Sequence, residues 1–256
     1  MPGIASAAVR ARRDPGVALW VVAGVCWVGT VWLVAGTGGV GHHGAVLERS
    51  TGPLRLGAIL AVWLVMIGAM MLPTVVPMVR LFGVVTARAP GPTAARLTFL
   101  AGYLAVWTAF AVLALLADQA VQALVAAWAW LAARPDFLLG ATLVLAGAFQ
   151  FSPLKNACLT ACRNPVEFLW LNYRRGAAGA WRLGLRHGVS CLGCCWALML
   201  VMIGTGIGSL VWMVGLTAVM LIEKTARRGA RLVAPVGVVL LVAGASLSVS
   251  GLLGAP

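Results

Sequence analysis

Long apolar runs, separated by short polar and basic segments, dominate the sequence. A helix that crosses the hydrocarbon core of a bilayer needs roughly 20 mostly apolar residues, and seven stretches meet or approach that length. These predicted spans cover approximately residues 17–37, 56–79, 97–117, 137–154, 187–205, 208–222 and 232–253. The pattern therefore predicts an all-α fold, a polytopic transmembrane helix bundle of about seven spans that forms a single integral membrane domain over residues 1–256.

Prolines, glycines and one long uncharged run set the expected ends of several spans. Pro73 and Pro77, near the end of the second span, predict a kink or early unwinding there. No charged residue lies in the 34-residue run Val189–Ile222, which is too long for one crossing. We expect a turn within residues 204–209 to divide this run into spans five and six. Small residues that favour close helix packing recur in span seven, at Gly237, Gly244, Ser248 and Gly251.

Two further stretches predict helices at the membrane interface. Residues 119–133 are apolar but short and contain Trp128 and Trp130, which fits an interfacial or re-entrant helix better than a span. Residues 166–181 mix aromatic and basic side chains, as expected of an interfacial helix. We therefore expect one or two interfacial helices beside the bundle.

The distribution of positive charge predicts the orientation of the chain. With the amino terminus inside, 16 of the 19 lysines and arginines fall in internal segments, and only Arg49, Arg55 and Arg134 are external. Cytoplasmic segments of membrane proteins carry such an excess. We therefore expect a multi-pass protein of the inner (plasma) membrane with a cytoplasmic amino terminus. The first span is too long for the apolar region of a signal peptide and is interpreted as a signal anchor.

The composition supports a membrane location and excludes other classes. Hydrophobic residues make up 62% of the chain and charged residues 10%, whereas soluble domains carry about 25% charged residues. A net charge of +13 would suggest nucleic-acid binding in a soluble protein, but these charges flank apolar runs. The expected partner is therefore the lipid bilayer, not nucleic acid. Span seven lacks a lysine that could carry a retinal Schiff base, which argues against a rhodopsin. The chain also lacks a G-x-x-x-x-G-K-S/T nucleotide motif, so this chain does not itself power any transport.

Five of the six cysteines form two groups. Cys158 and Cys162 follow span four, and Cys191, Cys194 and Cys195 lie near the start of span five. Spacings of three and four residues place the members of each group on one helix face. Because the predicted topology brings both groups to the inner membrane face, we predict one shared site.

The second cysteine group extends into a longer stripe. Steps of three and four residues connect His187, Cys191, Cys195, Met199 and Met202. Thiolate and thioether ligands favour Cu(I), and thiolates with imidazole also suit Zn(II). The sequence thus predicts a metal site made by the five cysteines, with His187, Met199 and Met202 as further candidate ligands. Span two adds methionines mostly in its inner half, at Met66, Met70, Met71 and Met78.

Several of these residue types also have structural interpretations. Methionine in an apolar helix is most often a packing residue, and Cys26, alone in span one, is interpreted as a small buried hydrophobe. His42 and His43 are interpreted as an exposed, solvated pair on the outer loop. Structural disulfides rarely persist beside a reducing cytosol. The clustering of five cysteines therefore favours metal binding or thiol chemistry over coincidence.

The charged residues near the cysteines are expected to have structural roles. Lys155 and Arg163 are predicted to extend to the inner head groups. Glu223 and Lys224 are predicted to cap the inner end of span six. Gln150 and Asn156 are expected either to form hydrogen bonds between helices or to support the ligands of a metal site.

Five segments of the sequence carry recognisable motifs. They are MIGAMMLP at residues 66–73, GYLAVW at 102–107, GAFQFSPLKNACLTACRNP at 147–165, HGVSCLGCCWALM at 187–199, and a W-M…E-K segment ending at Lys224. Together they resemble a bacterial family of predicted metal-binding integral membrane proteins, sometimes labelled copper chaperones. The resemblance extends over most of the chain from about Trp63 and implies metal binding by the five clustered cysteines.

These observations favour a metal-handling membrane protein that binds Cu(I), or alternatively zinc, and delivers it to a metal-accepting membrane or cytosolic protein or moves it across the bilayer. A membrane thiol-disulfide redox protein that uses Cys158/Cys162 against Cys194/Cys195 is the alternative. A structural membrane subunit with incidental cysteines is a third. No catalytic or organic-cofactor residues are predicted, so an enzyme is the less favoured class.

Overall fold

The computed structural model describes residues 15–36, 52–204 and 209–253, so His42 and His43 lie outside the described residues. Within these ranges every regular element is a helix, which confirms the all-α prediction there. In chain order the elements are α2 (Pro15–Gly36), α4 (Gly52–Val85), α5 (Pro92–Ala127), α6 (Ala129–Ala132), α7 (Pro135–Gln150), α8 (Pro153–Arg163), α9 (Pro165–Asn172), α10 (Ala177–Gly204), α11 (Leu210–Thr225), the 3-10 helix η1 (Gly229–Leu232) and α12 (Val233–Leu253).

Five helical segments of the described chain are long and apolar enough to cross a membrane: α2, α4, α5, α10 and η1 with α12. Helices α7 and α8 pass the same test only as a pair, bent by 64° at their junction. Helix α11 has 16 residues, about 24 Å at 1.5 Å per residue, which is less than a hydrocarbon core of about 30 Å. Each of the seven predicted stretches is mostly helical where described, and five or six of them have spanning length.

The prediction of a separate helix at residues 119–133 was wrong. Helix α5 runs without a break through Asp118 and is 36 residues long. Alanine and leucine, both strong helix formers, dominate its sequence on each side of Asp118, so one aspartate does not end it. The helix ends at Ala127, because the next residue, Trp128, has an extended backbone (φ −126°, ψ 93°), and α6 adds only four residues beyond it.

The predicted interfacial helix over residues 166–181 is divided between two elements. Helix α9 ends at Asn172, and α10 begins at Ala177. Gly176, between them, has φ 86°, a left-handed conformation that costs glycine little. Span five therefore begins well before the predicted residue 187, because the turn at Gly176 starts a new helix that continues to Gly204.

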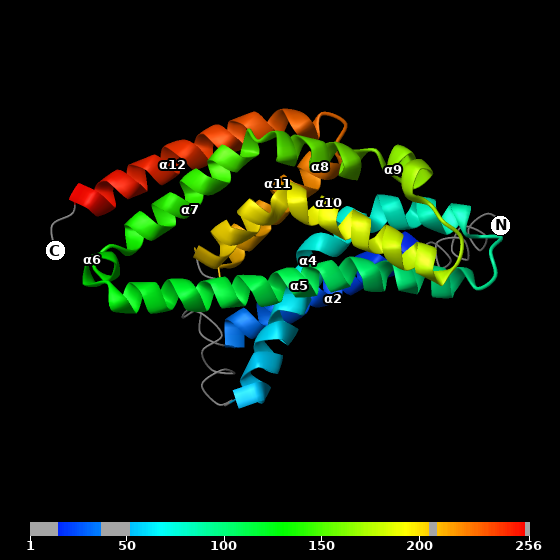
Figure 1. Ribbon diagram of the computed structural model, residues 1–256, viewed down its shortest axis with the longest axis horizontal. Coiled ribbons are helices and arrows are strands. Elements are labelled where there is room, and N and C mark those ends of the chain that lie inside the picture. The colour runs from blue at the N-terminus through cyan, green and yellow to red at the C-terminus, as the bar shows by residue number, and fades with distance from the viewer. Residues whose placement is uncertain (1–14, 37–51, 205–208, 254–256) are drawn as a thin grey trace, which may run out of the picture.

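Prolines act differently in α4 and at the junction of α7 with α8. Pro73 and Pro77 lie inside α4, which continues to Val85, so early unwinding does not occur. The first and last parts of α4 do run in different directions (Figure 1), as expected of a proline kink. Span four ends at Gln150 and not at Leu154, because Pro153 starts α8. The Ser152 side chain caps α8 by accepting the backbone N–H of Lys155 at 3.0 Å.

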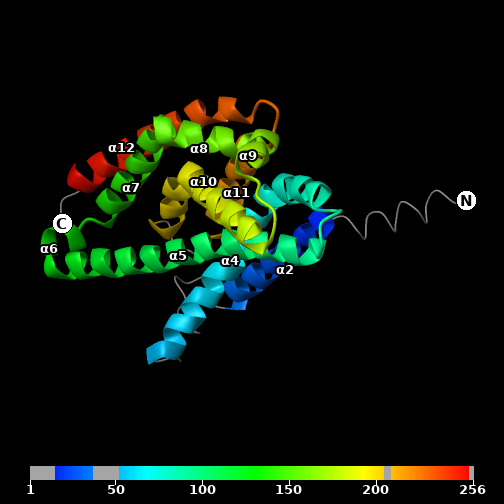
Figure 2. The same cartoon turned by 45° about the vertical axis from the view of Figure 1, so that its right-hand side comes forward.

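The helices differ strongly in burial. In α4 and α10, 67% and 56% of the residues in the apolar window are buried, against 17% in both α2 and α12. Helices α7 and α12 lie side by side along one edge, α5 lies along the opposite edge, and α10 and α11 lie between them (Figures 1 and 2). Exposed valines and leucines on α2 and α12 present an apolar surface suited to lipid.

Glycines bring α7 and α12 into close contact, which confirms the predicted packing notches of span seven. A Cβ added to Gly244 would lie 2.6 Å from the backbone N of Val144, and one on Gly251 would lie 2.8 Å from that of Phe137. Helices α5 and α10 approach equally closely, since a Cβ on Gly102 would lie 2.5 Å from the carbonyl oxygen of Trp181. This contact orients α10 against α5 and so positions the cysteines of α10.

Candidate metal centre

The stripe predicted on α10 is a buried face of that helix. Its five residues, at helical steps of four and three, have at most 3% of their side-chain surface exposed: His187, Cys191, Cys195, Met199 and Met202. The helix is continuous over the whole stripe. The stripe therefore faces other helices of the bundle, and its sulfur atoms are shielded from lipid and water.

Cys191 contacts polar groups from three other helices. The Lys224 ammonium of α11 donates to its Sγ at 3.1 Å, and the Tyr103 hydroxyl of α5 lies 3.2 Å from the same atom. Thr74 Oγ1 of α4 lies at 3.9 Å. An ammonium beside a sulfur stabilises a thiolate charge, so this geometry suits a negatively charged Cys191.

The Lys224 ammonium lies among three sulfur atoms. It is 3.1 Å from Cys191 Sγ, 3.5 Å from Cys195 Sγ and 3.9 Å from Met71 Sδ. Lys224 lies at the end of the predicted span six, but its side chain is only 6% exposed and is directed at these sulfurs. Helix α11 continues through Thr225, and Lys224 therefore lies in its last turn, packed against α4 and α10.

All six cysteines, which lie within the described ranges, are free thiols. Two of the thiols are turned toward the helix backbone, because Cys194 Sγ and Cys195 Sγ donate to the carbonyl oxygen of Cys191 at 3.1 and 3.0 Å. Such bonds occupy the thiol protons while the cysteines are unliganded. A metal ion would require these side chains to rotate away from the carbonyl.

The two cysteine groups lie on α8 and α10, which pack against each other. The Cys162 side chain interacts with the thiols of Cys191 and Cys194. Cys158 packs against α10 at Gly193, where an added Cβ would lie 2.6 Å from its Sγ. Because α8 is a separate helix at 64° to α7, its cysteines reach α10 laterally and do not simply extend span four.

A metal ion is compatible with the donor chemistry of this cluster but not with its present side-chain geometry. Among the residues that the structure describes, no three His, Cys, Asp or Glu side chains are placed to hold an ion together. Metal–sulfur bonds to Zn(II) are about 2.3 Å, whereas the sulfurs lie 3.1 to 3.9 Å from the Lys224 nitrogen at their centre. Binding would therefore require the ammonium to withdraw and the sulfurs to converge. Two thiols and a thioether are a soft donor set that fits Cu(I).

A buried ion pair links α8 to α11 beside the cysteines. Lys155 Nζ lies 2.7 Å from Glu223 Oε2, and the two side chains are 1% and 2% exposed. Arg163 donates to the backbone carbonyls of Glu223 and Arg227. The prediction that Lys155 extends to head groups was therefore wrong, because its side chain is buried against α11. Arg163 is half-buried and contacts the end of α11 and the residues after it.

His187 lies at one end of the stripe inside an aromatic cage. Its ring is 5.3 Å from the Phe168 ring, 5.9 Å from Tyr103 and 6.0 Å from Phe99, measured between centroids. Its Nδ1 atom is buried without a hydrogen-bond partner. A buried imidazole nitrogen without a partner is available as a ligand, which fits the predicted role of His187.

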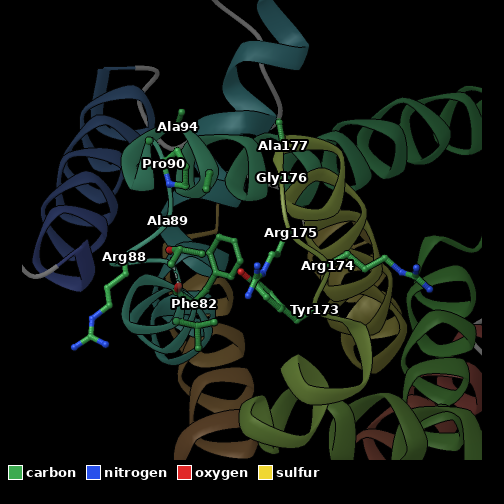
Figure 3. A pocket seen from close by; sticks show the side chains of 14 residues that line it. Phe82, Arg88, Ala89, Pro90, Ala94, Tyr173, Arg174, Arg175, Gly176 and Ala177 are labelled. Carbon is green, nitrogen blue, oxygen red and sulfur yellow. Dashed lines mark hydrogen bonds between the residues drawn. The ribbon is translucent and has the colours of Figure 1, made fainter.

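A cavity of about 670 Å³ opens near this end of the stripe. Phe82 and Tyr173 line it, and Figure 3 shows Arg88 and Arg174 extending to opposite sides of it. Phe82 stacks on Phe99 at 5.3 Å, and Phe99 contacts the His187 ring. A continuous series of aromatic side chains therefore connects the cavity to the first residue of the stripe.

Sequence reasoning missed three polar groups at the centre: Thr74, Tyr103 and Lys224. Two of them lay in segments that had already been singled out, since Tyr103 belongs to residues 102–107 and Lys224 ends the W-M…E-K segment. Met71 belongs to another such segment, residues 66–73, but was considered only as one of several methionines. Motif membership could have identified Tyr103 and Lys224. The predicted supporting residue Asn156 is exposed, and Gln150 is buried with no hydrogen-bond partner for its amide.

Residues 60–247 match the protein family described as PpoB2, copper chaperone. The matched range includes every residue of the candidate centre, from Met71 to Lys224. No curated protein and no solved structure matches the sequence.

Proposed function

Because the chain belongs to the PpoB2 copper chaperone family, we propose that it binds Cu(I) at the buried sulfur cluster and passes it to a metal-accepting protein. One observation carries this proposal. Sulfur atoms from two helices, Cys191 and Cys195 of α10 and Met71 of α4, surround a single point occupied by a cation, the Lys224 ammonium. Soft sulfur donors gathered around one point suit Cu(I) better than harder divalent ions.

The second cysteine group is proposed to take part in the same site. Cys162 already interacts with Cys191 and Cys194, and Cys158 packs against the same helix. Cu(I) could thus move from a pair of sulfurs on α8 to a pair on α10 by exchanging one ligand at a time. Such stepwise exchange avoids releasing a bare ion into an apolar interior, which would be costly.

The cavity lined by Phe82 and Tyr173 is the proposed access side. His187, with its unpartnered Nδ1, contacts Phe99, which stacks on the cavity residue Phe82, and is a suitable first ligand. Met199 and Met202 continue the stripe on the other side of the cysteines. We therefore propose that copper moves along α10, from His187 through the cysteines towards Met202.

The membrane orientation completes the proposal. The apolar helices suit insertion in the inner membrane, and the charge distribution favours a cytoplasmic amino terminus. The His187 end of the stripe would then face the cytoplasm. Reporter fusions after Arg96, Arg182 and Arg228 should report the cytoplasm, and a fusion near Glu48 should report the outside. A cytoplasmic report at Glu48 would require a different topology.

Metal stoichiometry of purified variants tests the proposed site. Wild-type protein in detergent, loaded under reducing conditions, should retain stoichiometric Cu(I). Replacing Cys191, Cys194 and Cys195 by Ser should abolish binding, and so should replacing Cys158 and Cys162. Cys26→Ser is the matched control and should bind normally, because Cys26 lies on α2, which contributes no ligand to the proposed site. Retention of copper after removal of both groups would refute the site.

A thiol-disulfide function is the second candidate, supported by the contact of Cys162 with Cys191 and Cys194. A disulfide-bearing partner protein would oxidise Cys162 together with Cys191 or Cys194, so that its own disulfide is reduced to two thiols and a new disulfide links α8 to α10. Thiol labelling of membranes under denaturing, non-reducing conditions separates the two functions. Copper handling predicts free or metal-bound thiols, whereas redox function predicts a Cys162 cross-link in a large fraction of the molecules.

A further inference from the structure

The Lys224 ammonium is buried without a carboxylate partner among the described residues that contact it. Its contacts are the sulfurs of Cys191, Cys195 and Met71. The neighbouring carboxylate, Glu223, is paired with Lys155 instead. A buried ammonium is costly unless it is compensated, so thiolate charge on the cysteines is the natural compensation.

The second observation is the composition of the sulfur set around this ammonium. Two of the three sulfurs, those of Cys191 and Cys195, can carry a negative charge, whereas the Met71 thioether is neutral. Two thiolates and the ammonium together leave a charge of minus one. A monovalent cation brings this sum to zero, whereas a divalent cation leaves a net positive charge in a low-dielectric interior.

We propose that Lys224 acts as a fixed positive charge that makes the sulfur centre selective for a monovalent soft cation over a divalent one. This inference rests on the proposed function and specifies its substrate as Cu(I) and not Zn(II). The ammonium sits on a flexible four-carbon side chain. It can therefore withdraw from the centre when the metal arrives while remaining close enough to compensate the second thiolate.

The ion pair beside the centre keeps this charge in place. Glu223 is the adjacent residue on α11, and its bond to Lys155 at 2.7 Å, together with the Arg163 contact to the α11 backbone, anchors that turn against α8. Glu223 Oε2 is thereby engaged by Lys155 and not by Lys224. The positive charge next to the sulfurs is thus a consequence of how the two neighbouring side chains are partnered.

Competition between the two metals tests the inference. The affinities of wild type, Lys224→Met and Lys224→Gln for Cu(I) and for Zn(II) are measured in detergent, against a Cu(I) chelator and a Zn(II) chelator respectively. Both variants should lower the ratio of Cu(I) affinity to Zn(II) affinity by about tenfold or more, because a unit charge a few ångströms from the ion is removed. Arg228→Met, which removes an exposed charge near the end of the same helix, should leave the ratio unchanged.

The outcomes separate this inference from the proposed function. A wild-type protein that holds no Cu(I) would overturn both. If the wild type binds Cu(I) but both Lys224→Met and Lys224→Gln keep its ratio of Cu(I) affinity to Zn(II) affinity, the charge selectivity alone is overturned. A reduced ratio in both variants, with the Arg228→Met control at the wild-type value, supports it. The two substitutions differ in polarity, so a folding defect in one leaves the test available in the other.

Discussion

Two helix pairs of similar apolar composition use their contact surfaces in opposite ways. Between α7 and α12, glycines such as Gly140 and Gly244 let the backbones approach, and backbone atoms fill the interface. Between α10 and α11 the interface instead holds Cys191, Cys195 and a lysine ammonium. The first arrangement favours tight packing, as small residues do in membrane helices. The second keeps reactive side chains together inside the bundle.

The difference teaches where stability and function lie in this molecule. The α7–α12 interface can tolerate few larger side chains, because its contacts are with backbone atoms that cannot move aside. The α10–α11 interface depends on charges that must be compensated, and its neighbouring charges on α8 and α11 are already paired. We therefore expect steric changes to matter most in the first region and charge changes to matter most in the second.

The largest effect is expected from breaking the ion pair that supports the charged region. Glu223→Leu leaves the buried Lys155 ammonium without its carboxylate and should lower the free energy of unfolding by about 3–5 kcal/mol. Thermal unfolding in detergent measures the loss. The double variant Lys155→Met with Glu223→Leu should be more stable than Glu223→Leu alone, and Glu167→Gln, at an exposed carboxylate, is the control. A double variant no more stable than the single one would contradict a role for the unpaired charge.

A smaller but clear effect is expected at the α7–α12 contact. Gly244→Val places side-chain atoms where an added Cβ already lies 2.6 Å from the backbone N of Val144, and overpacking of this kind costs about 1–3 kcal/mol. Gly215→Val is the matched control, because an added Cβ at Gly215 meets no atom within 4 Å. The melting temperature should be lower in Gly244→Val than in the wild type and unchanged in Gly215→Val. Copper stoichiometry of Gly244→Val below its melting temperature should match wild type, and a specific loss of copper would argue against separate roles for the two regions.

The smallest structural effect, with a kinetic consequence, is expected along the stripe. Met199→Leu and Met202→Leu conserve volume and should cost less than about 1.5 kcal/mol, while leaving the copper stoichiometry unchanged. They remove thioethers beyond the cysteines, so transfer of Cu(I) to an external chelator should slow several-fold. Met213→Leu, at a buried methionine of α11 outside the stripe, is the control. Equal transfer rates in all three variants would show that Met199 and Met202 do not take part in the proposed route.

The helices were predictable because a long, mostly apolar run is typical of a helix of membrane-spanning length. The predicted stripe on α10 is also a local property, since steps of three and four residues define a helix face before any tertiary contact forms. The roles of Lys155 and Lys224 were not predictable in this way. A lysine near the end of an apolar helix ordinarily extends to the head groups. The carboxylate that pairs with Lys155, Glu223, lies 68 residues further along the chain, so no local pattern indicates the pair. The continuity of α5 through Asp118 was also not predicted. A single charge in an apolar run suggests the end of a span, but the residues around Asp118 favour helix and the helix continues.

The Lys155–Glu223 pair has a consequence for how the chain is made. Synthesis from the amino terminus completes α8 while α11 is still unmade, so Lys155 stays without its partner for 68 residues of elongation. During that interval burial of the Lys155 ammonium would be uncompensated and costly, so we expect α8 not to reach its final position against α11. Arrival of Glu223 then permits α8 and its cysteines to dock against α10. The pair thus delays assembly of the sulfur cluster until nearly all of the helices have been synthesised.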